Sequence, residues 1–165
     1  MKIIYLIFTI FIFSSFALPE EDVKKETDSI LHSVKNVSES DRLRLLDQWA
    51  QDHSNRDVKY SYFYALIHEA ELQNNDWYKG EAYYLTAALF YGLNSDSMFY
   101  YMHKAEPLLL KAHRINDIFR MRTWNIYSLA NEGESGRVLP EIQALKDYAR
   151  KMNYPEGIDM ATQCL

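Results

Sequence analysis

The chain has 165 residues, with 18 basic side chains against 23 acidic ones, for a formal net charge of −5. The basic residues are scattered, which argues against nucleic-acid binding, because a phosphate backbone has to be met by a basic face. Cys164 is the only cysteine, so an intramolecular disulfide is excluded. Thirteen Tyr, eight Phe and three Trp against five Gly and four Pro favour long helices, and no segment alternates like a half-buried strand.

Residues 1–17 are predicted to be a secretory signal peptide. Lys2 supplies the positive end, an apolar run follows, and Ser15 and Ala17 place small side chains at −3 and −1 of a cleavage site. The alternative is an uncleaved membrane anchor, but the apolar run is short against the ~20 residues that a spanning helix needs. We therefore expect an exported protein on the periplasmic side of the inner membrane.

Residues 18–37 are predicted to be an acidic tail that runs into a short helix, and residues 38–165 to be helical repeats. Apolar side chains recur there at helical spacing. The predicted helices are one that opens at 38–41, where Ser38 and Ser40 can cap it, one at about 58–74, one at about 77–92, one that carries 98–112, one at about 118–131, one that carries 138–152, and one that opens at 156.

Each of the first six of these helices has one face assigned to the core. These faces are Leu43, Leu46, Trp49 and Ala50; Tyr62, Phe63, Leu66, Ile67 and Ala70; Tyr84, Ala87, Ala88 and Tyr91; Met98, Met102, Ala105, Leu109 and Ala112; Met121, Trp124, Tyr127 and Ser128; Val138, Ile142, Leu145, Ala149 and Met152. Pro107 is expected to kink or split its helix, whereas Pro140 is expected in a first turn, where proline is tolerated.

The junctions between helices repeat along the chain. Asn75, Asn116 and Asn153 each open a similar stretch, and they lie 41 and 37 residues apart. This period, with two helices in each unit, is typical of helix–turn–helix solenoids. Because one pair cannot bury its apolar face alone, neighbouring pairs have to stack. A chance similarity among ordinary helices is the alternative.

Within each pair, the first helix carries a large aromatic residue, then small residues, then Tyr. Tyr84, Ala88 and Tyr91 follow this order, as do Trp124 and Ser128. The pattern resembles the tetratricopeptide repeat, with Ala88 and Ser128 in place of the usual glycine. The resemblance implies an all-α fold, a right-handed solenoid of antiparallel helix pairs, whose last repeat, opening at Glu156, is incomplete.

A second resemblance is more specific; it covers roughly residues 58–165 and is closest over residues 118–165. Trp124, SGRVL at 135–139, ARKMNYPEGI at 149–158 and ATQCL at 161–165 are similar to the sensor regions of certain bacterial histidine kinases. The resemblance implies an N-terminal sensory part of a membrane-bound kinase in two-component signal transduction, with the transmembrane helix and kinase core beyond residue 165. The alternative is a free-standing periplasmic binding or assembly protein.

No motif for catalysis was found, and we expect no catalytic, cofactor-binding or metal-binding residues and no cofactor. The five histidines form no metal-binding His-Glu-x-x-His motif, and the glycines form no phosphate-binding loop. Cys164 is interpreted as a small core residue. The chain is therefore predicted not to be an enzyme. Its expected partner is a protein or peptide in a concave groove lined by surplus tyrosines, and a homodimer is compatible with this role.

Overall fold

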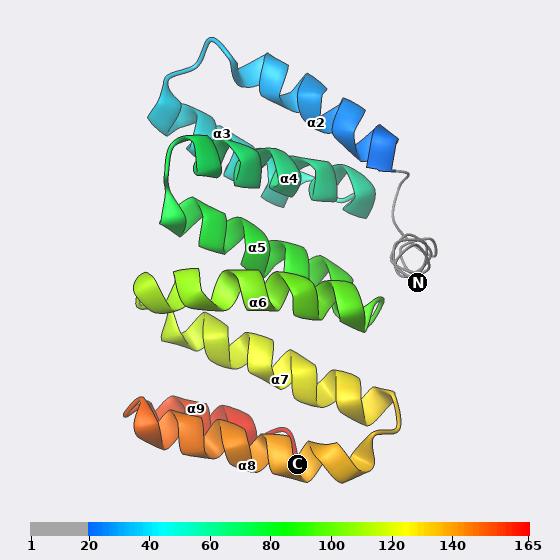
Figure 1. The fold of residues 1–165 in the computed structure, drawn as a ribbon, viewed down its shortest axis with the longest axis vertical. Coiled ribbons are helices and arrows are strands. Elements are labelled where there is room, and N and C mark those ends of the chain that lie inside the picture. The colour runs from blue at the N-terminus through cyan, green and yellow to red at the C-terminus, as the bar shows by residue number, and fades with distance from the viewer. Residues whose placement is uncertain (1–19) are drawn as a thin grey trace, which may run out of the picture. The chain divides into compact units, whose positions relative to one another are not determined.

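A computed structural model describes residues 20–165, and the predicted signal peptide lies outside them (Figure 1). This described part is all-helical and contains no strand, which confirms the predicted all-α class. None of its helices is both long and apolar enough to cross a membrane. The helices are α2 (Glu20–Val34), α3 (Glu39–Asp52), α4 (Arg56–Leu72), α5 (Asp76–Phe90), α6 (Ser95–Lys111), α7 (Ile115–Asn131), α8 (Ser135–Lys151) and α9 (Pro155–Thr162).

The chain divides into two compact units, with the boundary after Ala65, inside α4. In the first unit, α2 already begins at Glu20, so most of the predicted acidic tail is helical. Val23, Thr27, Ile30 and Val34 form its buried stripe, as expected for side chains three and four residues apart. The Thr27 hydroxyl donates a hydrogen bond of 3.4 Å to the backbone carbonyl of Ser61 in α4.

The starts of α3 and α4 are fixed by side-chain caps. The Ser38 hydroxyl accepts a hydrogen bond of 3.3 Å from the backbone N–H of Asp41, as the sequence predicted. The Asn55 side chain caps α4 by accepting from two backbone N–H groups at 2.9 and 3.1 Å. Of the face predicted for α3, Leu43, Leu46 and Ala50 are buried, but Trp49 is only half-buried.

In the second unit, residues 66–165, consecutive helices from α5 to α9 pack against one another. In addition, α5 contacts α7, and α7 contacts α9. Figure 1 shows these five helices following one another in chain order. The core between α7, α8 and α9 consists of Phe119, Ile126, Ile142, Leu145, Ala149 and Ala161.

Two kinds of turn alternate in this unit. Asn74, His113 and Asn153 precede α5, α7 and α9 with φ of 52°, 57° and 50°, and they lie 39 and 40 residues apart. Gly92 and Gly133, 41 residues apart, precede α6 and α8 with φ of 72° and 79°. The backbone therefore repeats about every 40 residues.

The hydrogen bonds at the turns before α5, α7 and α9 are the same each time. In each of these turns, the residue with positive φ has a left-handed backbone conformation. The residue after it donates its backbone N–H to the carbonyl five residues earlier, as in a Schellman motif. The pairs are Asn75–Ala70, Arg114–Leu109 and Tyr154–Ala149, at 2.8–2.9 Å. The predicted match between Asn75 and Asn116 is therefore wrong by two residues. Arg114 is the residue that stands where Asn75 stands, at the N-cap.

Close approach between helices occurs at glycines that the sequence pattern did not single out. A Cβ on Gly80 of α5 would lie 3.0 Å from the Cβ of Leu108 in α6. A Cβ on Gly157 of α9 would overlap the Phe119 ring of α7. Of the two residues that stand in place of the usual repeat glycine, Ser128 is buried, but Ala88 is exposed.

Neither proline interrupts its helix. α6 continues through Pro107, so the expected split does not occur. α8 begins at Ser135, which puts Pro140 in the second turn rather than the first. Since Pro140 has no N–H, the carbonyl of Gly136 receives no helical hydrogen bond from it.

Candidate functional site

The second unit presents a row of large aromatic side chains on α5. Trp77, Tyr84 and Tyr91 follow one another at seven-residue steps, which places them on one face of the helix. Trp77 is 48% exposed and Tyr91 is 38% exposed, whereas Tyr84 between them is buried. The predicted inward position is therefore confirmed for Tyr84 and wrong for Tyr91, which follows the last residue of α5.

Two aromatic residues of α7 extend this row. Trp124 stacks on Tyr84 with ring centroids 5.4 Å apart and also contacts Tyr91 at 5.8 Å. Tyr127, three residues further on, is 38% exposed, although the sequence placed it in the core. We refer to Trp77, Tyr84, Tyr91, Trp124 and Tyr127 together as the aromatic surface. Aromatic side chains that remain exposed in this way are enriched at protein interfaces.

Arg114 is held against the aromatic surface by two carboxylates. Its guanidinium forms ion pairs with Glu81 and, at 2.7 Å, with Asp117. It also lies 5.5 Å from the ring centroid of Trp77 and 5.6 Å from that of Tyr84, within the range of a cation–π interaction. All three ionic side chains are mostly buried, so the cluster supports the aromatic surface from beneath Trp77 and Tyr84.

The pKa values of this cluster follow from burial and charge. Burial opposes the charged form of Arg114, but hydrogen bonds and charge from Glu81 and Asp117 outweigh it and raise the pKa of Arg114. Burial is also the main cause that raises the pKa of Tyr84, and the charges of Asp117 and Glu81 add to it. Arg114 therefore stays charged and Tyr84 stays neutral at physiological pH.

At its far edge, the aromatic surface meets the residues that follow α9. The Tyr127 hydroxyl lies 3.5 Å from the backbone carbonyl of Gln163, and its hydrogen bond to Cys164 raises the pKa of Tyr127. Burial raises the pKa of the Cys164 thiol, and the Tyr127 hydrogen bond acts in the opposite direction. A neutral, half-buried thiol is a poor nucleophile.

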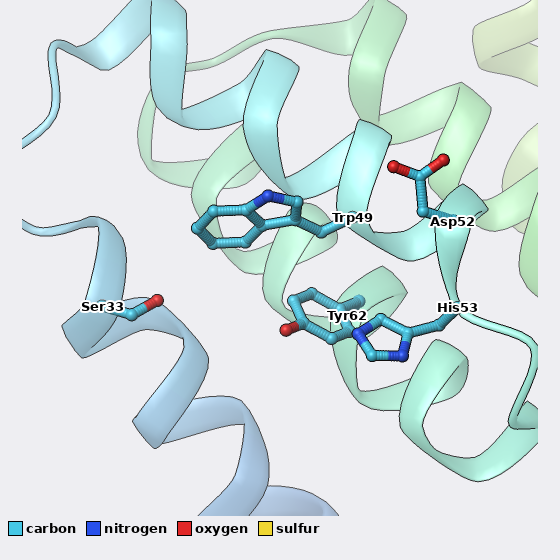
Figure 2. Close-up of a pocket in the computed structure, with 5 residues that line it drawn as sticks. All are labelled: Ser33, Trp49, Asp52, His53 and Tyr62. Atoms are coloured by element: carbon cyan, nitrogen blue, oxygen red, sulfur yellow. The ribbon is translucent and has the colours of Figure 1, made fainter.

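The first unit contains a separate pocket of about 480 Å³, lined by Ser33, Trp49, Asp52, His53 and Tyr62 (Figure 2). The rings of Trp49 and Tyr62 meet nearly at right angles, with centroids 6.1 Å apart. His53 stacks on Tyr62 at 4.8 Å. The pocket is therefore an aromatic corner with a carboxylate beside it.

Three helices position these side chains, since Tyr62 comes from α4 and the others from α2 and the end of α3. Trp49 and Asp52 come from the last turn of α3, and His53 is its C-cap, with the backbone N–H donating to the Trp49 carbonyl at 3.2 Å. Ser33 of α2 donates its hydroxyl to the Ile30 carbonyl at 2.6 Å. Within residues 20–165, the Trp49 indole N–H, the Asp52 carboxylate and the Tyr62 hydroxyl have no hydrogen-bond partner.

The sequence pattern missed this pocket because it assigned Trp49 and Tyr62 to the core. The four-residue step from Trp49 to His53 at a helix end was the available signal, since it places both rings on one side. In the part of the chain that the structure describes, no three His, Cys, Asp or Glu side chains come together in a way that could hold a metal ion.

Comparisons of the chain with protein-family models, with curated proteins and with solved structures gave no match.

Proposed function

We propose that this protein is an exported, tetratricopeptide-like binding module that recognises a segment of another protein across its aromatic surface. One observation carries this proposal: Trp77, Tyr91 and Tyr127 remain exposed on the aromatic surface, and Trp77 lies beside a mostly buried arginine–carboxylate cluster. Binding hot spots have this composition, with large aromatic side chains and Arg on a preorganised support.

The right-handed solenoid of helix pairs is part of the proposal. Its support is the alternation of two turn types about every 40 residues, together with the contacts of α5 with α7 and of α7 with α9. In stacked helix pairs, the first helix of one repeat packs against the first helix of the next repeat. Since α5 and α7 carry the aromatic surface, these first helices would line the groove.

The sensory role rests on the resemblance of residues 118–165 to histidine-kinase sensor regions. In that role, a bound segment would favour one arrangement of the repeats over another, and the kinase would respond to the change. The reading frame beyond the codon for Leu165 tests it. A transmembrane helix followed by a kinase core is the expected result, and a stop codon would favour the free-standing binding protein.

The binding proposal is tested by selecting peptides from a displayed library with the purified protein. We expect the selected peptides to lose about tenfold in affinity with Trp77→Ala and with Tyr91→Ala, because truncating an aromatic hot spot costs more than 1 kcal/mol. Tyr100→Ala is the control, since Tyr100 is a tyrosine on α6, outside the aromatic surface, and is 54% exposed, more than Trp77 or Tyr91. Selected peptides that bind all variants equally would overturn the proposal.

A further inference from the structure

We propose that the pocket formed by Ser33, Trp49, Asp52, His53 and Tyr62 binds the cationic end of a lysine or arginine side chain. The inference rests on the proposed function, because it names the kind of residue that the bound protein segment contributes. It concerns the first unit alone, and it uses none of the residues of the aromatic surface.

The ring geometry suits a cation. The face of an aromatic ring is electron-rich, so an ammonium or guanidinium group within about 6 Å of a ring centroid is attracted to it. Trp49 and Tyr62 form two walls at an interplanar angle of 76°, and the stacked His53 supports the Tyr62 ring. A group in this corner can therefore contact more than one ring.

The charges point to the same ligand. Asp52 is exposed at the pocket and forms no ion pair with any residue in the range 20–165. The pocket lining contains no Lys or Arg, and the whole chain carries a net charge of −5. Asp52 would repel an anionic ligand and attract a cationic one from the edge of the pocket, where Figure 2 shows its carboxylate pointing away from the Trp49 and Tyr62 rings.

The second unit contains the same chemistry with its cation already in place. There, the Arg114 guanidinium lies over Trp77 and Tyr84 and pairs with Glu81 and Asp117. The pocket repeats the combination of a Trp, a Tyr and a carboxylate, but no side chain of the described residues supplies the cation. We infer that a partner does.

The volume of the pocket indicates how much of the ligand it can hold. A volume of about 480 Å³ exceeds the volume of one side chain, and the pocket is open on one side. A basic residue could therefore enter together with its neighbours in a peptide. The polar groups left without protein partners, the Trp49 indole N–H and the Tyr62 hydroxyl, are available to the backbone of that peptide.

The test uses NMR of the three tryptophan indole N–H signals in the intact protein, with Trp49→Phe to assign the Trp49 signal. The probes are N-acetyl-argininamide and its neutral isostere N-acetyl-citrullinamide, each titrated into the millimolar range. We expect the argininamide to shift the Trp49 signal in a saturable way, while the citrullinamide leaves it unchanged. Equal shifts with both probes, or with a neutral sugar, would overturn the proposal.

The role of the carboxylate is tested separately with Asp52→Asn. The variant should weaken argininamide binding about two- to fivefold, which corresponds to the worth of an exposed ion pair. Asp28→Asn is the matched control, because Asp28 is an exposed aspartate on α2 outside the pocket, and it should leave the affinity unchanged. Equal affinities for the protein and its Asp52→Asn variant would sink the cation assignment.

These measurements separate the two proposals. The small probes do not require the aromatic surface, so the pocket can bind them even if Trp77→Ala leaves peptide binding unchanged. In the opposite case, peptides that depend on Trp77 but lack any preference for Lys or Arg would support the proposed function and contradict the pocket assignment.

Discussion

The Phe119 ring of α7 lies directly against the backbone of Gly157 in α9, in the space that a Cβ at position 157 would occupy. Phe119 is fully buried and also contacts Tyr148 and Tyr154, with ring centroids 5.5 and 5.0 Å away. The ring therefore has no room to move away from a larger residue.

We predict that Gly157→Ala destabilises the protein by about 1–3 kcal/mol, the usual cost of overpacking a core. Urea unfolding followed by circular dichroism measures the change. Gly136→Ala is the control, because a Cβ at Gly136 in α8 meets no atom within 4 Å. That variant should be neutral or slightly more stable, since Ala favours the helix. A stable Gly157→Ala variant would mean that α9 does not pack on Phe119.

A second prediction concerns the turn before α7. His113 has a φ of 57°, a left-handed conformation that costs a non-glycine residue about 1–2 kcal/mol. Replacement by glycine removes this strain but adds freedom to the unfolded chain, worth about 0.4–1 kcal/mol in the opposite direction. His113→Gly should therefore raise the free energy of unfolding by roughly 0.5 kcal/mol.

The matched comparison is Gly133→Ala at the turn before α8. Its φ of 79° is strained for alanine although a Cβ there has open space, so this variant should lose about 1 kcal/mol. If His113→Gly were less stable than the parent protein, the His113 side chain would have to make a stabilising contact in addition to forming the turn.

Much of the helical framework could be predicted from the sequence, because apolar periodicity and caps are local signals. Ser38 at the start of α3 and the buried face of Leu43 and Leu46 were predicted, and they are confirmed. The register of the repeats was not predicted correctly, because the sequence pattern aligned Asn75 with Asn116. Asn74 and His113 are equivalent because both have a positive backbone φ, and their different side chains do not predict this shared conformation.

The candidate sites were harder to predict than the fold. A tyrosine on an apolar helical stripe can be buried, like Tyr84, or exposed at the edge of the same stripe, like Tyr91. The difference is set by which neighbouring helix covers the position, and periodicity within one helix does not contain that information. For the same reason, Trp49 was assigned to the core although it lines the pocket.

The Arg114 cluster leads to a third prediction. Arg114→Ala leaves Glu81 and Asp117 without their shared partner in a mostly buried position, so we expect a loss of about 1–3 kcal/mol in stability. Arg137→Ala is the control, because Arg137 and Glu134 form an exposed ion pair, and its effect should stay below about 0.5 kcal/mol. Equal effects of the two substitutions on urea unfolding would contradict a structural role for the cluster.

The last prediction concerns Cys164, whose pKa is raised above the usual thiol value chiefly by burial. Only the thiolate reacts with iodoacetamide, so the pH midpoint of alkylation in the folded protein should lie above that of N-acetyl-cysteine. Unfolding the protein in urea should return the midpoint to the value of the free thiol. The single cysteine makes the reaction easy to follow by mass spectrometry.

The raised pKa of Cys164 also makes the free energy of unfolding depend on pH. Because the folded pKa of Cys164 is raised, the folded state holds its proton more tightly than the unfolded state does. The resulting contribution to stability is fully present below the unfolded pKa and is lost as pH rises through the folded pKa. Cys164→Ser should therefore reduce the loss of stability on the alkaline side, measured between neutral pH and pH 10. A midpoint of alkylation at or below that of the free thiol would instead show that burial does not raise the pKa of Cys164.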